Sequence, residues 1–137
     1  MQLQTAVLLL GTNIGNKVQN IETAIQYIEK EIGEIKKKTE ILETKPVEFV
    51  SQNIFYNFAT IIETHLSPIA LLKKIKEIEQ KMGRMQDSRA LDGYADRVMD
   101  IDIVSYSNVC YKSDRLGIPH RKHLFEREFS KELLRML

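Results

Sequence analysis

The chain has 137 residues, a length typical of one domain with its own hydrophobic core. It carries 20 Lys and Arg against 19 Asp and Glu, and this near balance argues against a strongly basic nucleic-acid-binding protein. The single cysteine, Cys110, excludes an intrachain disulfide and a cysteine-only metal site, and it suits a reducing cytoplasm, where we expect the protein.

The first expected element is a buried strand over residues 4–11. Its apolar stretch, Ala6–Leu10, is too short to cross a membrane and lacks the basic flank of a signal peptide. From Val18 to Ile32 apolar residues recur every three or four positions, which predicts an amphipathic helix. We expect Gly33 to end this helix as the residue that follows its last turn.

The middle of the chain predicts two strands and a second helix. Residues 35–42 alternate between apolar and polar side chains, and residues 55–64 are rich in aromatic and β-branched types, so each segment is expected to form a strand. Ser67–Pro68 is typical of a helix start, with Ser as N-cap and Pro at the first helical position. Apolar periodicity extends this helix over residues 69–82, and Gly83 closes it.

The last third begins with a charged loop over residues 84–96, followed by an alternating strand at 98–106. A short strand is expected at 109–111 and a helical piece near 131–136. The order strand-helix-strand-strand-helix-strand predicts an α+β fold, a ferredoxin-like sandwich in which the helices pack on one face of an antiparallel sheet. We expect one domain over residues 1–137.

Asp100 and Asp102 form the strongest local feature. Residues two apart in a strand project from one face, roughly 6–7 Å apart, while Ile101 and Ile103 face the core from the other side. Two carboxylates so close repel each other unless a cation compensates, and Mg²⁺ binds carboxylates together with phosphate oxygens. The open alternative is an exposed strand face with two solubilising aspartates, the more frequent case for an isolated pair.

Basic residues near this strand suggest phosphate recognition. Arg97 lies three residues before Asp100, and Arg84 begins the charged loop. A planar guanidinium matches phosphate oxygens, although a surface salt bridge is the commoner role of a single arginine. His120 could donate to a phosphate oxygen, but its neighbourhood is typical of a solvated run of charge. That run comprises Arg115, Arg121, Lys122 and His123.

Phe55 and Asn57 lie two positions apart on an expected strand. An aromatic ring beside a side-chain amide can stack on a flat heterocycle and hydrogen-bond to it, while core packing of Phe55 is the open alternative. The turn at residues 11–13 matches neither common glycine-rich phosphate loop. Candidates for magnesium, phosphate and flat-ring binding on one small domain together indicate phosphoryl transfer or nucleotide binding.

The order and spacing of six segments resemble the 6-hydroxymethyl-7,8-dihydropterin pyrophosphokinases, enzymes of the folate pathway. The resemblance runs from about residue 6 to residue 129. The segments are residues 10–13 (LGTN), 43–47 (ETKPV), 55–59 (FYNFA), 78–84 (IEQKMGR), 96–103 (DRVMDIDI) and 118–120 (IPH). The D-I-D-I strand preceded by an arginine and the later I-P-H are the most diagnostic.

This resemblance implies transfer of pyrophosphate from ATP to the hydroxymethyl group of the pterin, giving AMP, with two Mg²⁺ ions. It implies that Asp100 and Asp102 hold both metals and that Arg84 and Arg97 handle the phosphates, so these four are the expected catalytic residues. It implies a substrate set of ATP and the hydroxymethyl-dihydropterin. We expect a monomer without nucleic-acid or membrane partners.

The resemblance also implies which residues contact each substrate. Phe55 and Phe129 correspond to the two rings that sandwich the pterin, and Asn57 to the side chain that reads its edge. The full set expected to bind pterin is Thr44, Lys45, Val47, Phe55, Asn57, Asp100 and Phe129. The set expected to bind ATP is Glu79, Arg84, Arg97, Ile103, Arg115, His120 and Arg121.

The chain departs from the family pattern in several places. Residues 94–97 read Tyr-Ala-Asp-Arg where the family usually has Trp-Gly-Pro-Arg. One residue more than usual separates His120 from Arg127, and common members continue beyond the position of Leu137. These departures keep open an alternative, a nucleotide- or pterin-binding module with weak or no catalysis. An RNA-binding domain on the same fold is disfavoured because no basic-aromatic strand motif is present.

Overall fold

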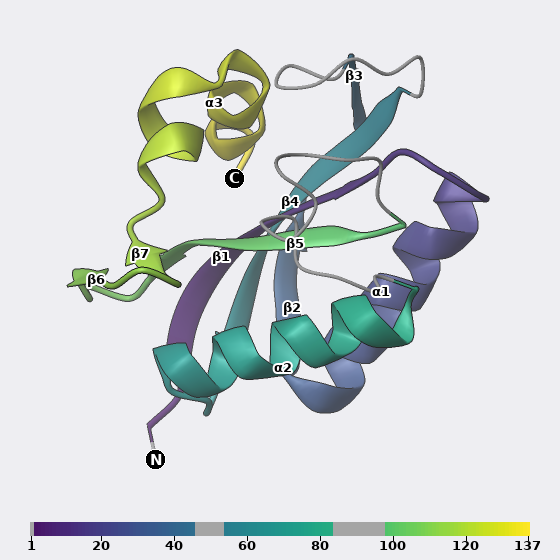
Figure 1. The fold of residues 1–137 in the computed structure, drawn as a ribbon. Helices are drawn as coiled ribbons and strands as arrows, with labels where there is room; N and C mark the ends of the chain where they lie inside the picture. Colours follow the sequence, from purple (N-terminus) through teal and green to yellow (C-terminus); the bar gives the residue numbers. More distant parts are fainter. Residues whose placement is uncertain (1, 46–53, 84–97) are drawn as a thin grey trace.

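The computed structural model describes residues 2–45, 54–83 and 98–137, and Figure 1 shows how they are arranged. The loop predicted over residues 84–96 lies outside this part of the chain. The elements in chain order are β1 (Gln4–Thr12), α1 (Lys17–Glu31), β2 (Gly33–Lys38), β3 (Leu42–Thr44), β4 (Phe55–Thr64), α2 (Pro68–Lys81), β5 (Asp100–Tyr106), β6 (Tyr111–Lys112), β7 (Gly117–Ile118), the π-helix η2 (Lys122–Glu126) and α3 (Glu128–Arg135).

One sheet carries the fold, with its strands in the order β2-β4-β1-β5 and the short β3 also paired to β4. Every pairing in it is antiparallel. The central position of β1 agrees with its unbroken apolar sequence, because a central strand is covered on both faces. This strand order confirms the predicted ferredoxin-like α+β architecture. The strands β6 and β7 form a separate hairpin.

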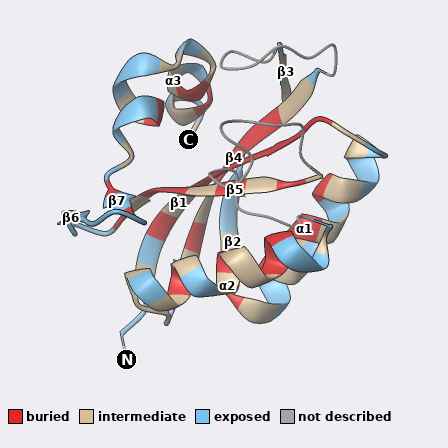
Figure 2. Cartoon of the chain, in the orientation of Figure 1, coloured by how far each residue is buried: buried red, intermediate tan, exposed pale blue. Residues whose placement is uncertain are grey.

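Helices α1 and α2 cover one face of the sheet (Figure 1). Leu8 and Leu10 of β1, Ile28 of α1 and Ile75 of α2 belong to the main core cluster, each at most 1% exposed. Figure 2 shows buried residues along β1 and on the sides of α1 and α2 that face the sheet. The predicted start of α2 is confirmed, because the hydroxyl of Ser67 accepts a hydrogen bond from the amide of Ala70 at 3.2 Å.

Helix α3 packs on the opposite face of the sheet, around Leu9, Ala59, Val104 and Leu133. The sequence predicted a helical piece near residues 131–136, and α3 starts a turn earlier than that. It also predicted helices on one face only, so the layer on the second face is new. Every helix in the described part of the chain falls short of the length and apolar character of a membrane span.

One local expectation is confirmed and another requires correction. Gly33 directly follows Ile32, the C-cap of α1, as expected. It also opens β2, where a Cβ atom would lie 1.9 Å from the carbonyl oxygen of Glu63, so glycine allows β2 and β4 to approach each other. The strand predicted over 35–42 is divided in two, since the hydroxyl of Thr39 accepts from the amide of Ala59 at 2.9 Å and interrupts the regular ladder. Gly83 follows α2 with a φ of +114°, as expected of a closing glycine.

Candidate active site

A row of three residues crosses the sheet on the face that α3 partly covers. Asn57 of β4 pairs with Gly11 of β1, and Gly11 pairs with Asp100 of β5. Asp102, two positions further along β5, shares this face. Adjacent strands lie about 4.8 Å apart, so the sheet holds the Asn57 amide and the aspartates at neighbouring positions.

Gly11 is buried in the middle of this row, and the side chains of Asn57 and Phe55 lie over it. A Cβ atom there would lie 2.7 Å from Oδ1 of Asn57 and 3.5 Å from Cδ1 of Phe55. The amide nitrogen of Asn57 donates to Oγ1 of Thr44 at 2.7 Å and lies 3.5 Å from the carbonyl oxygen of Leu42. Since the amide nitrogen bonds to β3, the acceptor oxygen of Asn57 lies on the side of Gly11.

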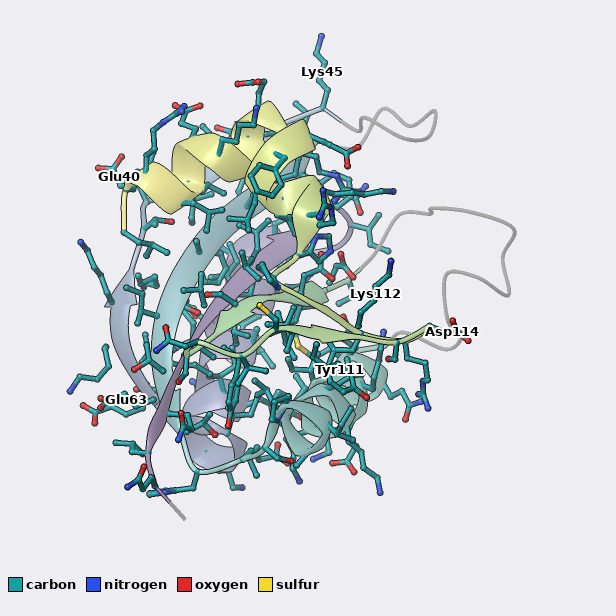
Figure 3. The ribbon with its side chains drawn as sticks, turned by 90° about the vertical axis from the view of Figure 1, so that its left-hand side faces the viewer. Glu40, Lys45, Glu63, Tyr111, Lys112 and Asp114 are labelled. Carbon is teal, nitrogen blue, oxygen red and sulfur yellow. The ribbon has the colours of Figure 1, made fainter. Side chains whose placement is uncertain are left out.

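A cavity of about 600 Å³ opens between β3 and the η2–α3 segment. Its lining includes Thr44, Lys45 and Phe129, so the structure brings together three residues that were expected to bind pterin. Figure 3 shows Lys45 extending away from the sheet. The remaining lining residues are Lys122, Glu126, Arg127 and Glu128. Phe55 pairs directly with Thr44 along β4 and β3, at the same end of the sheet.

Asp102 is held by a buried histidine. Nε2 of His123 lies 2.7 Å from Oδ2 of Asp102, and Nδ1 of the same ring lies 2.6 Å from Oγ of Ser130. The His123 side chain is 2% exposed, and that of Asp102 is 30% exposed. The histidine therefore joins β5 to α3 and leaves part of the Asp102 carboxylate open to solvent.

These contacts set the charge of the aspartate and of its histidine neighbour. Burial raises the pKa of Asp102, but the hydrogen bond and charge of His123, with the charge of His120, outweigh it and hold the pKa at about 2. Burial and the nearby charge of His123 lower the pKa of His120 to about 4. Near neutral pH the site thus contains an ionised Asp102 and an uncharged His120 ring.

The burial of His123 corrects the sequence interpretation, which grouped it with a solvated run of charge. The π-helix η2 is closed by a hydrogen bond from the amide of Arg127 to the carbonyl of Lys122 at 2.9 Å. The signal that could have identified His123 is its position three residues after His120, a spacing that places two side chains on one helical face.

The residues around His120 form a second cavity of about 720 Å³. It brings His120 and Arg121, two residues expected to bind ATP, next to the β6–β7 hairpin. Its lining comprises Cys110, Tyr111, Lys112, Gly117, Ile118, Pro119, His120, Arg121, Lys122 and Phe125. Figure 3 shows the hairpin projecting from the body, with Asp114 at its outer end. Arg115 is exposed on the turn between β6 and β7.

Two other residues expected to bind ATP are buried beneath the site. Glu79 is 1% exposed, and its Oε2 accepts a hydrogen bond from the amide of Ile101 at 2.8 Å. Ile103 is 3% exposed and belongs to the core cluster on the α1 and α2 side. Neither lines the two cavities: Glu79 anchors β5 through the amide of Ile101, and Ile103 packs β5 against the core. Arg84, Arg97 and Val47 lie outside the described residues, and their roles stay predictions.

Comparison with known proteins gives a family match over nearly the whole chain. The family model described as 7,8-dihydro-6-hydroxymethylpterin-pyrophosphokinase (HPPK) matches residues 7–137. The chain is 35% identical over 118 residues to the 2-amino-4-hydroxy-6-hydroxymethyldihydropteridine pyrophosphokinase of Aquifex aeolicus, covering 86% of this chain and 71% of that protein. It is 30% identical over 125 residues to the protein of the same name in Bacillus subtilis, covering 90% and 72%.

Other relatives are much longer proteins. The chain is 39% identical over 122 residues to the folic acid synthesis protein FOL1 of Dictyostelium discoideum, covering 89% of this chain but only 18% of that protein. Among solved structures, the wild-type HPPK-DHPS of Plasmodium falciparum with pteroate matches with a TM-score of 0.70 at 17% identity, covering 96% of this chain and 40% of that one. That likeness shows the shared fold.

Proposed function

Because the chain belongs to the 7,8-dihydro-6-hydroxymethylpterin-pyrophosphokinase family, we propose that it transfers the pyrophosphoryl group of ATP to 6-hydroxymethyl-7,8-dihydropterin. The products are AMP and the pterin diphosphate, and the reaction takes place in the cytoplasm. The observation that carries the proposal is the row Asn57–Gly11–Asp100, which sets a hydrogen-bonding amide and a carboxylate on either side of a glycine.

The pterin is proposed to bind beside Asn57, on the sheet face that carries Gly11. Oδ1 of Asn57 lies toward Gly11, away from the partners of the amide nitrogen in β3, so it can accept a hydrogen bond from an N–H group at the edge of the heterocycle. Phe55 and Phe129 supply aromatic surface on which a flat ring can stack. Thr44 fixes the Asn57 amide and, with Lys45, lines the neighbouring cavity; Val47 is proposed to contact the pterin as well. An analogue that lacks the matching N–H would leave Asn57 unpaired and bind weakly.

Asp100 and Asp102 are the proposed ligands of two Mg²⁺ ions. The donor set fits the metal, since both are carboxylates on one strand face and the low pKa of Asp102 keeps it anionic. Magnesium, when bound, would neutralise charge on the phosphate oxygens of ATP. Asp100 lies next to Gly11, so a pterin held by Asn57 would present its hydroxymethyl group near the same carboxylates.

The ATP phosphates are proposed to lie along the cavity that contains His120 and Arg121. The uncharged ring of His120 can donate one hydrogen bond to a phosphate oxygen, and Arg121 can donate several. Arg84, Arg97 and Arg115 are proposed to contact the phosphates as the substrates come together. Glu79 and Ile103 act on the ATP side by holding β5 in place.

The proposal is tested by incubating the purified chain with MgATP and 6-hydroxymethyl-7,8-dihydropterin and separating the products by chromatography. We expect AMP and pterin diphosphate in equal amounts, and no AMP when the pterin is omitted. An Asp100→Asn variant is expected to lose activity because one carboxylate is removed from the metal pair. Binding of an ATP analogue without AMP formation, under conditions where the Aquifex aeolicus relative is active, would contradict the proposal.

A further inference from the structure

Asp102, His120 and His123 bring three different ligand groups together. One ring nitrogen of each histidine and one carboxylate oxygen of the aspartate all lie within 4.8 Å of one another. Asp102 lies in β5, His120 lies just before η2, and His123 lies within η2. Imidazole nitrogen combined with a carboxylate is a donor set suited to Zn²⁺, whereas Mg²⁺ prefers oxygen ligands alone.

In each ring, Nδ1 contacts a group of the protein, which leaves Nε2 as the nitrogen that could bind a metal. Nδ1 of His123 is 2.6 Å from the buried hydroxyl of Ser130, while its Nε2 faces Asp102. Nδ1 of His120 lies 3.4 Å from the amide of His123, and the His120 backbone amide donates to the carbonyl of Val104 at 2.8 Å. Metal-binding histidines are typically held in this way, with one ring nitrogen fixed by the protein and the other on the metal.

We propose that Asp102, His120 and His123 form a binding site for a Zn²⁺-class cation. Binding displaces the proton shared between Nε2 of His123 and Asp102 into solvent, and the metal takes its place between the two groups. Zinc binding does not require the substrates, but the site shares Asp102 with the proposed magnesium pair and His120 with the proposed phosphate contacts. If the proposed function holds, Zn²⁺ and Mg²⁺ compete for this carboxylate, and zinc inhibits the transfer reaction.

The experiment titrates Zn²⁺ into the metal-free chain, without nucleotide, in competition with a chromophoric zinc chelator. We expect one equivalent of Zn²⁺ per chain, with affinity at least about tenfold lower in His120→Gln and in His123→Gln. Two matched controls remove the other candidate ligands. His65→Gln changes the one remaining histidine, and Cys110→Ser the single thiol, which lines the same cavity as His120. Both controls should bind zinc like the unaltered chain.

The proposal would be overturned if His120→Gln and His123→Gln bound zinc as tightly as the unaltered chain. Loss of zinc binding in Cys110→Ser, or the absence of stoichiometric binding to the unaltered chain, would also overturn it. A second measurement needs no substitution in the core. Co²⁺ bound to the unaltered chain should give visible d–d absorption of a nitrogen- and oxygen-ligated site, and a thiolate charge-transfer band would overturn the assignment. These readouts do not involve AMP formation, so failure of the zinc site and failure of the proposed transfer activity are distinguishable.

Discussion

Nε2 of His123 lies 2.7 Å from Oδ2 of Asp102, although the two residues are 21 positions apart in the chain. The bond joins η2 to β5, and Ser130 of α3 holds the other side of the ring. Because both His123 and Ser130 are buried, the ring has little freedom to move away. His123 of η2 therefore fixes the position of the Asp102 carboxylate, which is proposed to bind metal.

The first prediction concerns this support. His123→Gln should raise the Mg²⁺ concentration needed for half-maximal activity by about 10- to 100-fold, the range found when a group that orients a metal ligand is removed. Ser130→Ala should have a smaller effect in the same direction, because it loosens the ring without removing it. Initial rates across a magnesium titration measure both, with His65→Gln as the control. An unchanged magnesium requirement in His123→Gln would show that Asp102 needs no such support.

The second prediction concerns Gly11, which lies next to the Asn57 amide proposed to bind the pterin. Gly11→Ala should weaken pterin binding and raise the KM for pterin, because the new methyl group would lie 2.7 Å from Oδ1 of Asn57 and push it aside. In an Asn57→Ala background the same substitution should cost little, since the clashing atom is gone. Pterin fluorescence titrations of the four proteins complete a double-mutant cycle. Additive effects of the two substitutions would contradict the proposed contact.

The third prediction is a dependence of stability on pH in the metal-free chain. The folded pKa of Asp102, about 2, lies below its ordinary value of 3.8, so folding favours the ionised form. This contribution to the free energy of unfolding is fully present above about pH 4 and is lost as pH falls toward 2. Urea unfolding of the unaltered chain and of Asp102→Asn should give a stability difference that shrinks over this interval. A constant difference would contradict the low pKa.

The fourth prediction separates two roles of Glu79. Glu79→Ala should lower the free energy of unfolding by about 1–3 kcal/mol, because the buried amide of Ile101 loses its acceptor. Glu79→Gln keeps an acceptor oxygen and should lose less. Urea unfolding measures the stabilities, and ATP titrations measure the KM for ATP. A raised KM in Glu79→Gln without loss of stability would instead indicate direct contact with the nucleotide.

Sequence patterns predicted the parts of the fold that depend on local periodicity. The alternation in β5 correctly put Asp100 and Asp102 on one face, with Ile101 and Ile103 in the core on the other, because a strand repeats every two residues. The start of α2 followed from Ser67, whose capping bond is made within the same turn. The strand order could also be inferred, since the succession of elements restricts how they pair.

The remaining features depend on residues far apart in sequence. The role of Gly33 is set by the carbonyl of Glu63 on the neighbouring strand. His123 is buried because Asp102 and Ser130 engage both sides of its ring, which a run of basic neighbours does not reveal. The orientation of the Asn57 amide beside Gly11 is likewise set by Thr44 of β3. In each case the residue can be read from the sequence, but its contact partner is known only once the fold brings the two elements together.

The central claim is the transfer of an intact pyrophosphoryl group, and ATP labelled on both the β- and γ-phosphates tests it most directly. Incubated with the chain, Mg²⁺ and 6-hydroxymethyl-7,8-dihydropterin, this ATP should give unlabelled AMP and a pterin product that carries both labelled phosphates. Formation of ADP together with a pterin that carries only the γ-phosphate would contradict the account.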